Sequence, residues 1–209
     1  MRFPARLLPA AAFALLAFSC ASTTPVDMKE PRRLVGTENG VRIDAQIFGE
    51  QFSPGQAVAI TYDVTNERPG AVAVADLVPV SSYDPETQTV TVTFGSEIPG
   101  HELLPRLLVI PSGQKKSFSG SAVISGVFGT GSGFQRAPRG LQVMLHFLGE
   151  TKPFEQLIGI QERVVRNPQL ADALLAKWLE RTETIITNVL PMRWVLPFNP
   201  DEGTVRRRP

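Results

Sequence analysis

Residues 57–75 read AVAITYDVTNERPGAVAVA, and this stretch decides the fold class. Across 58–64 every second side chain is large and apolar, which is the pattern of a strand with one buried face. The strand ends before Pro69 and Gly70, which suit the two central positions of a type II turn. The chain then returns toward Val80 with alternate valines. The stretch therefore predicts a β-hairpin.

The same alternation recurs along the chain at intervals of about ten residues. Turn formers separate the runs, as at Asp84-Pro85 and at Pro111-Ser112-Gly113. The runs are 41–47, 58–64, 72–80, 89–94, 107–110, 117–124 and 141–147. An eighth strand is expected within 184–194, which is rich in Ile, Thr and Val. Seven or eight short strands predict a mainly β fold, a two-sheet β-sandwich, with an eight-stranded barrel as the competing closure.

One helix is expected after Gly149. Asn167 and Pro168 suit an N-cap and the first helical position. Apolar residues then follow on one side at Leu170, Leu174 and Trp178. This spacing predicts an amphipathic helix near 168–181 whose apolar stripe packs on the sandwich, with a partner-binding groove as the alternative.

The N-terminal segment has the composition of a secretory signal. Arg2 and Arg6 flank the start of an apolar run over 7–18, and Cys20, the only cysteine of the chain, closes it. The run is too short for a membrane-spanning helix, which needs about 20 apolar residues, and Pro9 interrupts it. A plain secretory signal with an incidental cysteine is the alternative interpretation.

With its sole cysteine at the end of the apolar run, this segment resembles the signal of a bacterial lipoprotein. The resemblance implies that Cys20 is lipidated, becomes the first residue of the mature chain and anchors it in a membrane. Ala21 stands where an aspartate usually retains such proteins at the inner membrane. The resemblance therefore implies an outer-membrane protein that faces the periplasm.

These features give a predicted domain organisation. It comprises a signal peptide (1–19), a lipid anchor and flexible linker (20–36), a β-sandwich domain (37–199) and a disordered tail (200–209). A flexible linker of this length spans about 20–25 Å on average. The sandwich resembles an immunoglobulin-like domain in architecture, although both tryptophans lie near the C-terminus and the Cys…Trp…Cys pattern is missing.

Several chemistries are disfavoured by the sequence. The chain has 21 Lys and Arg against 20 Asp and Glu, so its charge gives no reason to expect nucleic-acid binding. His101-Glu102 begins like the zinc motif H-E-x-x-H, but Pro105 occupies the fifth place, and His146 is remote. Ser132 has neither the spacing of a nucleophile elbow nor that of a dinucleotide-binding loop. We therefore expect no metal, no cofactor and no catalytic residues.

The glycine-rich segment 125–140 is the candidate binding loop. It is long for a hairpin connection, and loops of such length are usually functional or disordered. Its aromatic and basic residues belong to types enriched in interface hot spots: Phe128, Phe134, Arg136 and Arg139. A loop with no binding role is the alternative.

The sequence thus favours a non-catalytic, lipid-anchored interaction or scaffold module of the cell envelope that docks another envelope protein. The alternative is an envelope enzyme, or a carrier of a small ligand or glycan, whose site is assembled only by the fold.

Overall fold

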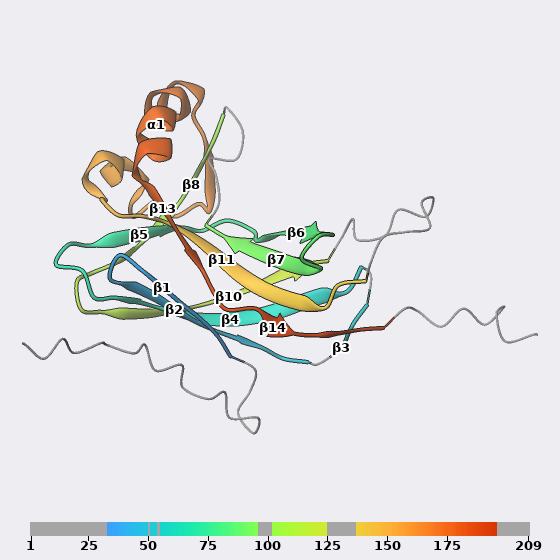
Figure 1. Ribbon diagram of the computed structural model, residues 1–209. Coiled ribbons are helices and arrows are strands. Elements are labelled where there is room, and N and C mark those ends of the chain that lie inside the picture. Colours follow the sequence, from blue (N-terminus) through green and yellow to red (C-terminus); the bar gives the residue numbers. More distant parts are fainter. Residues whose placement is uncertain (1–32, 50, 54, 96–101, 125–136, 196–209) are drawn as a thin grey trace, which may run out of the picture.

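The computed structural model describes residues 33–49, 51–53, 55–95, 102–124 and 137–195. The predicted signal peptide, most of the predicted linker and the predicted tail 200–209 lie outside these residues. Two sheets pack face to face, so the expected two-sheet β-sandwich is confirmed (Figure 1). The long helix α1 (Pro168–Arg181) stands beyond the second sheet.

The first sheet has four antiparallel strands in the order β1-β2-β4-β10. Their bounds are Arg33–Glu38 (β1), Val41–Ile47 (β2), Ala57–Asn66 (β4) and Lys115–Val123 (β10). Each strand has an apolar inner face and a polar outer face, as the alternation predicted.

The second sheet follows the order β6-β7-β11-β5-β9, and β13 and β14 also pair with β11. The bounds are Val72–Ala75 (β5), Val80–Asp84 (β6), Thr89–Phe94 (β7), Leu107–Ile110 (β9), Gly140–Leu148 (β11), Thr182–Ile186 (β13) and Leu190–Pro191 (β14). The central pair, β7 and β11, is parallel, whereas the other pairs are antiparallel.

Two short pairs complete the strands. At one end of the sandwich β3 (Gln51–Phe52) runs parallel to β15 (Arg193–Trp194). On the outer face of the second sheet β8 (Leu103–Pro105) is antiparallel to β12 (Val164–Arg166).

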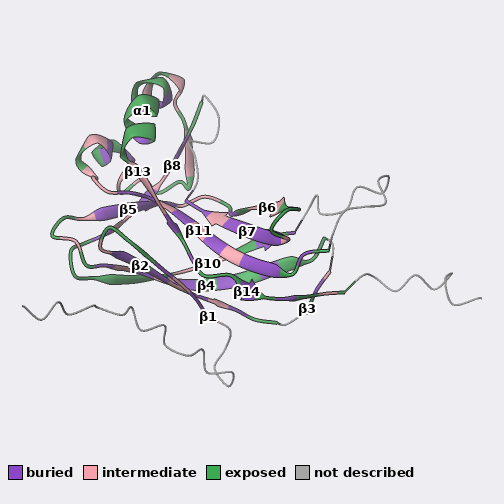
Figure 2. Ribbon diagram, in the orientation of Figure 1, coloured by how far each residue is buried: buried purple, intermediate pink, exposed green. Residues whose placement is uncertain are grey.

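The main hydrophobic core lies between the two sheets and takes alternate residues from both (Figure 2). Tyr62 is buried in it, stacks on Phe118 with ring centroids 5.1 Å apart and tilts against Phe94 at 4.4 Å. Burial raises the pKa of the Tyr62 hydroxyl above its ordinary value, so Tyr62 serves as an uncharged core residue.

A second, smaller core lies on the outer face of the second sheet, under a cap. The cap consists of the β8–β12 pair, the 3-10 helix η1 (Lys152–Leu157) and α1. The sandwich contributes Ala73, Ala75, Leu107 and Leu148, and the cap contributes Leu104, Phe154, Leu157, Ala171, Leu174 and Trp178. The predicted packing of the helix on the sandwich is therefore confirmed.

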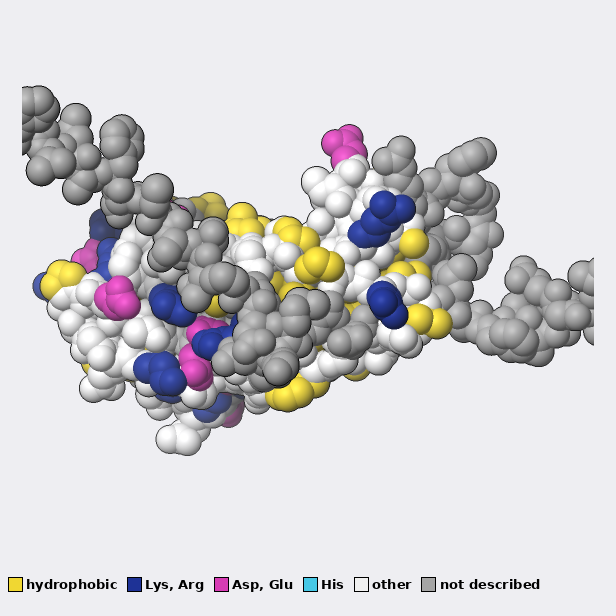
Figure 3. All heavy atoms as spheres, turned by 60° about the horizontal axis from the view of Figure 1, so that its bottom comes forward, with side chains coloured by type: hydrophobic (Ala, Val, Ile, Leu, Met, Phe, Trp, Pro, Cys, Tyr) yellow, Lys and Arg dark blue, Asp and Glu magenta, His cyan; other side chains and the backbone are white. Residues whose placement is uncertain are grey.

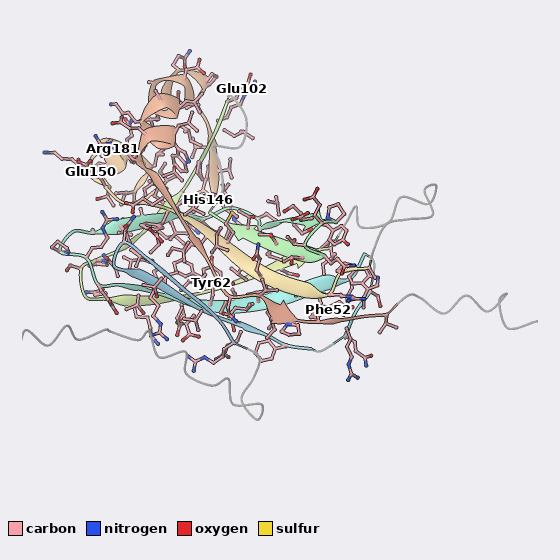
Figure 4. The ribbon with its side chains drawn as sticks, in the orientation of Figure 1. Phe52, Tyr62, Glu102, His146, Glu150 and Arg181 are labelled. Carbon is pink, nitrogen blue, oxygen red and sulfur yellow. The ribbon has the colours of Figure 1, made fainter. Side chains whose placement is uncertain are left out.

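The predicted start of the helix is also confirmed. The Asn167 side chain accepts a hydrogen bond from the Leu170 N–H at 3.0 Å, and Pro168 is the first helical residue. At the other end Arg181, in the last turn, forms an ion pair with Glu150 (Figure 4).

The predicted hairpin over residues 57–80 is wrong. β4 pairs with β2 and β10 in the first sheet, whereas β5 pairs with β9 and β11 in the second. The chain crosses from one sheet to the other between them. Gly70 has no positive φ, so the predicted type II turn is wrong too.

Asn66 is the buried residue at which this crossing begins. Its Nδ2 donates to the carbonyl oxygens of Gly70 (2.8 Å) and Ile110 (3.0 Å), and its Oδ1 accepts from the Arg68 N–H (3.0 Å). Because Ile110 belongs to the second sheet, one side chain ties β4 to β9 and fixes the path of the crossing segment.

We expect Asn66→Ala to lower the free energy of unfolding by about 2–3 kcal/mol, because three hydrogen bonds are lost and buried backbone groups are left without partners. Urea unfolding followed by circular dichroism measures this change. Glu67→Ala, which alters the exposed residue next to Asn66, is the control. Its free energy of unfolding should stay within about 0.5 kcal/mol of that of the unsubstituted protein. Equal stability of the two variants would contradict a clamping role for Asn66.

Two further boundaries differ from the predictions. Residues 33–36, assigned to the linker from sequence, open β1, and Leu34 lies in the main core. The expected single strand over 184–194 is divided into β13, β14 and β15. The division falls at Thr187, whose buried hydroxyl accepts a hydrogen bond from the Val143 N–H at 2.9 Å.

Candidate functional site

The outer face of the second sheet is divided into a covered half and an uncovered half. The cap covers the half formed by β5, β9 and the end of β11. The other half is formed by β6, β7, β13 and the first part of β11, and we call it the open face. Its residues are Val80, Ser82, Asp84, Thr89, Thr91, Thr93, Gly140, Gln142, Met144, His146, Thr184, Ile186 and Val189.

A row of three apolar residues and one threonine, which we call the apolar row, crosses the open face. Val80 is opposite Thr93, Thr93 is opposite Met144, and Met144 is opposite Ile186, so the row spans four adjacent strands. The strand neighbours of Thr93, Met144 and Ile186 lie in the main core, so these three side chains point outward. Ser81, the neighbour of Val80, donates to the Val123 carbonyl of the first sheet, so Val80 points outward as well. Val80 and Ile186 are 55% and 53% exposed. The row thus offers uncovered apolar surface at both ends.

The next two rows carry mainly polar side chains. In the first, Ser82, Thr91 and Gln142 are aligned, and Gln142 Nε2 donates to Thr91 Oγ1 at 2.9 Å. In the second row, Asp84 of β6 is opposite Thr89 of β7, and Thr89 is opposite Gly140 of β11.

Position 140 has little room for a side chain, which explains its glycine. A Cβ on this residue would lie 2.5 Å from the Val189 side chain, so Val189 packs directly against the β11 backbone. Val189 thereby adds a partly exposed apolar group to the open face.

His146 lies where the open face meets the cap (Figure 4). Its Nδ1 is 2.8 Å from Thr184 Oγ1 on the adjacent strand β13. A histidine held by a neighbouring threonine is a polar member of a sheet face, as the sequence allowed for this strand residue.

The outer face of the first sheet is different in character, because charged side chains gather on it (Figure 3). Arg33 forms an ion pair with Asp44, and Lys115 pairs with Asp63 at 2.9 Å. Hydrogen bonds from Ser117 and Lys115 lower the pKa of the Asp63 carboxyl.

The open face, by contrast, has little charge. Within the described part of the second sheet its residues include one carboxylate, Asp84, and neither lysine nor arginine. Asp84 lies in the β6–β7 turn that the sequence predicted, where Thr87 Oγ1 and the Glu86 N–H donate to it and lower its pKa. The Asp84 carboxylate is therefore hydrogen-bonded within its own turn, at one corner of the open face.

The sequence-predicted binding loop is described only at its end. Phe128, Phe134 and Arg136 lie outside the described residues. Arg139 is exposed, its N–H donates to the Gln88 carbonyl at 2.8 Å, and it directly precedes Gly140. The loop therefore joins the open face at Gly140.

The zinc-like motif is not helical. Glu102 precedes strand β8, which contains Leu103, Leu104 and Pro105, and His101 lies outside the described residues. Among the described residues, no three His, Cys, Asp or Glu side chains are grouped so that they could hold a metal ion. Likewise, within the described ranges no helix has the length and hydropathy to cross a bilayer.

Comparison with known protein families, with curated proteins and with solved structures found no match for this chain.

The open face itself was missed from the sequence. Its signals were Thr89, Thr91 and Thr93, which alternate with the core residues of β7. Threonine on the outer side of a strand is common, so this alternation predicted a strand and nothing more.

Proposed function

We propose that this protein is a non-catalytic, lipid-anchored module of the bacterial cell envelope that docks another envelope protein through the open face. The observation that carries the proposal is the apolar row Val80–Thr93–Met144–Ile186 on a charge-poor sheet face. The centres of protein interfaces are depleted in charge, and their apolar groups are desolvated on binding.

The other half of the same sheet face supports this proposal. Where the cap lies on it, small and apolar side chains such as Ala73, Ala75 and Leu148 form a core. The open half continues the same sheet through β11 and also has a low charge. We therefore expect the partner to present an uncharged, partly apolar surface, with groups that can hydrogen-bond to the exposed Ser82 and the half-buried Thr93, whereas Thr89 and Thr91 are buried.

The N-terminal segment supports the proposed place at the envelope. In our proposal the lipid on Cys20 anchors the protein in the outer membrane, and the sandwich faces the periplasm. The anchor confines the module near other envelope proteins, which raises their effective concentration.

Introducing charge into the apolar row tests the docking proposal. We expect Val80→Asp together with Ile186→Asp to abolish crosslinking to the partner in intact envelopes, because the carboxylates would be buried without a counter-charge. The free energy of unfolding should change by no more than about 0.5 kcal/mol, since both side chains are more than half exposed. Photo-crosslinking from position 82, followed by mass spectrometry, identifies the partner and measures its capture.

Two further variants make the result specific. Val123→Asp changes a valine that is 52% exposed and belongs to β10 of the first sheet, and it should leave capture intact. Leu179→Asp alters the outer side of α1, where Leu175 and Leu179 are both exposed. Loss of capture in Leu179→Asp but not in the open-face variant would place the docking surface on the cap.

A separate variant tests whether the loop 125–140 takes part in docking. Replacing Phe128 and Phe134 by Ser, and Arg136 and Arg139 by Gly, should reduce capture without lowering stability if the loop extends the docking surface at Gly140. Unchanged capture would restrict the surface to the open face.

A further inference from the structure

Phe48 lies at the end of the sandwich where the described chain begins. Arg33, the first residue of β1, is opposite Gln46 of β2, and Phe48 follows Gln46 by two residues. This end of the domain is therefore the part connected most directly to the N-terminal segment. We call it the tether end, comprising Arg33, Gln46 and Phe48.

The Phe48 side chain is directed to solvent. It is 63% exposed, whereas Ile47 before it and Phe52 after it are buried in the main core. In β2 the odd-numbered residues point into the core and the even-numbered residues point outward, and the exposed Phe48 follows this alternation. Phe48 thus belongs with Asp44 and Gln46 on the outer side of the first sheet.

The backbone around Phe48 is anchored on both sides. Ile47 is held in β2 opposite Ile60, and Phe52 is held in β3 opposite Trp194. The Val195 N–H also donates to the Phe52 carbonyl at 2.9 Å. Phe48 therefore directly follows a residue that is held in β2.

We propose that the tether end rests against the bilayer and that Phe48 inserts its ring into the headgroup region. This inference depends on the proposed lipid anchor at Cys20. Cys20 and Arg33 are 13 positions apart, so even a fully extended chain keeps the tether end within about 45 Å of the anchor. An exposed aromatic ring near a bilayer gains by burial at the boundary of headgroups and acyl chains.

The charges around the tether end are compatible with this placement. Arg33 pairs with Asp44, so that carboxylate is neutralised, and Arg193 of β15 is opposite Gln51. Basic side chains are favoured at an anionic bilayer surface.

Contact at the tether end would orient the whole domain. Phe48 is on the outer side of the first sheet, and the open face is on the outer side of the second. The two surfaces lie on opposite sides of the sandwich, with the cap on the side of the open face (Figure 1). A bilayer at Phe48 thus leaves the docking surface accessible from the periplasm.

Tryptophan reporters at two positions test this inference. The protein beginning at Cys20 is coupled through its single thiol to maleimide lipid in vesicles of phosphatidylethanolamine and phosphatidylglycerol. One variant carries Phe48→Trp and the other Val78→Trp, because Val78 is also 63% exposed but precedes β6 of the second sheet. The fluorescence of the unsubstituted protein is subtracted, which removes the contribution of Trp178 and Trp194.

We expect brominated lipids to lower the added fluorescence of Phe48→Trp at least twofold and to leave that of Val78→Trp unchanged. An added signal in Phe48→Trp that is not quenched, or is quenched no more than in Val78→Trp, would overturn the inference. Chemical coupling replaces biological lipidation in this experiment, so the outcome does not depend on whether Cys20 is modified in cells. The two proposals can therefore fail separately.

Discussion

Replacement of Cys20 by serine is expected to move the protein from the membrane fraction to the soluble fraction. In the proposed anchor, Cys20 carries the lipid, and each buried methylene of an acyl chain contributes about 0.8 kcal/mol to membrane binding. One chain gives only marginal binding, whereas two or more hold a protein stably. Serine has no thiol to modify, so the whole of this contribution is lost.

Fractionation of envelopes and intact-mass measurement of the purified chain provide the readouts. Ser22→Ala is the matched control, because it alters a small side chain two positions away and leaves the thiol in place. The unsubstituted protein and the control should both show lipid mass and remain with membranes. A Cys20→Ser protein that stays with membranes, together with an unsubstituted protein that lacks lipid mass, would refute the anchor.

Local patterns in the sequence were sufficient to predict the individual elements. Strands such as β2 and β4 bury every second residue, and this period is visible without knowledge of the partner strand. Helix α1 carries its own start signal in Asn167 and Pro168 and its own apolar stripe. These features depend on neighbours within a few residues, so they can be predicted from the local sequence alone.

The pairing of the strands could not be predicted in the same way. Residues 66–70 contain a Pro-Gly pair that suits a hairpin, yet they carry the chain across the core to the other sheet. What decides between these paths is the hydrogen bond from Asn66 to Ile110, a residue 44 positions away. A local turn signal contains no information about such a distant partner.

The candidate site could not be predicted from the sequence for a related reason. Its apolar row takes Val80, Thr93, Met144 and Ile186 from four strands, and their alignment depends on the registers of three strand pairs. Each residue alone is an ordinary outward-facing residue of a strand. The 125–140 loop was conspicuous because its composition is local, whereas the open face exists only once the sheet has formed.

Substitution of Trp178 by alanine is expected to produce the largest loss of folding stability. Trp178 is 3% exposed, and its ring meets Phe154 edge to face with centroids 5.6 Å apart. It lies in the second core with Leu148 of β11 and Leu104 of β8, so it joins the cap to the sandwich. Removing the indole leaves a cavity beside Phe154 in this core, and such a cavity closes only partly.

Loss of a buried tryptophan typically costs about 3–5 kcal/mol, and we expect Trp178→Ala to lower the free energy of unfolding by that amount. Leu179→Ala, one residue further on and 69% exposed, should change it by no more than about 0.5 kcal/mol. Urea unfolding monitored by far-UV circular dichroism should show one transition at a lower midpoint, because β5, β9 and β11 contribute to both cores. A loss below about 1 kcal/mol would show that the indole does not fasten the cap to the sheet, since a cap held elsewhere tolerates the truncation.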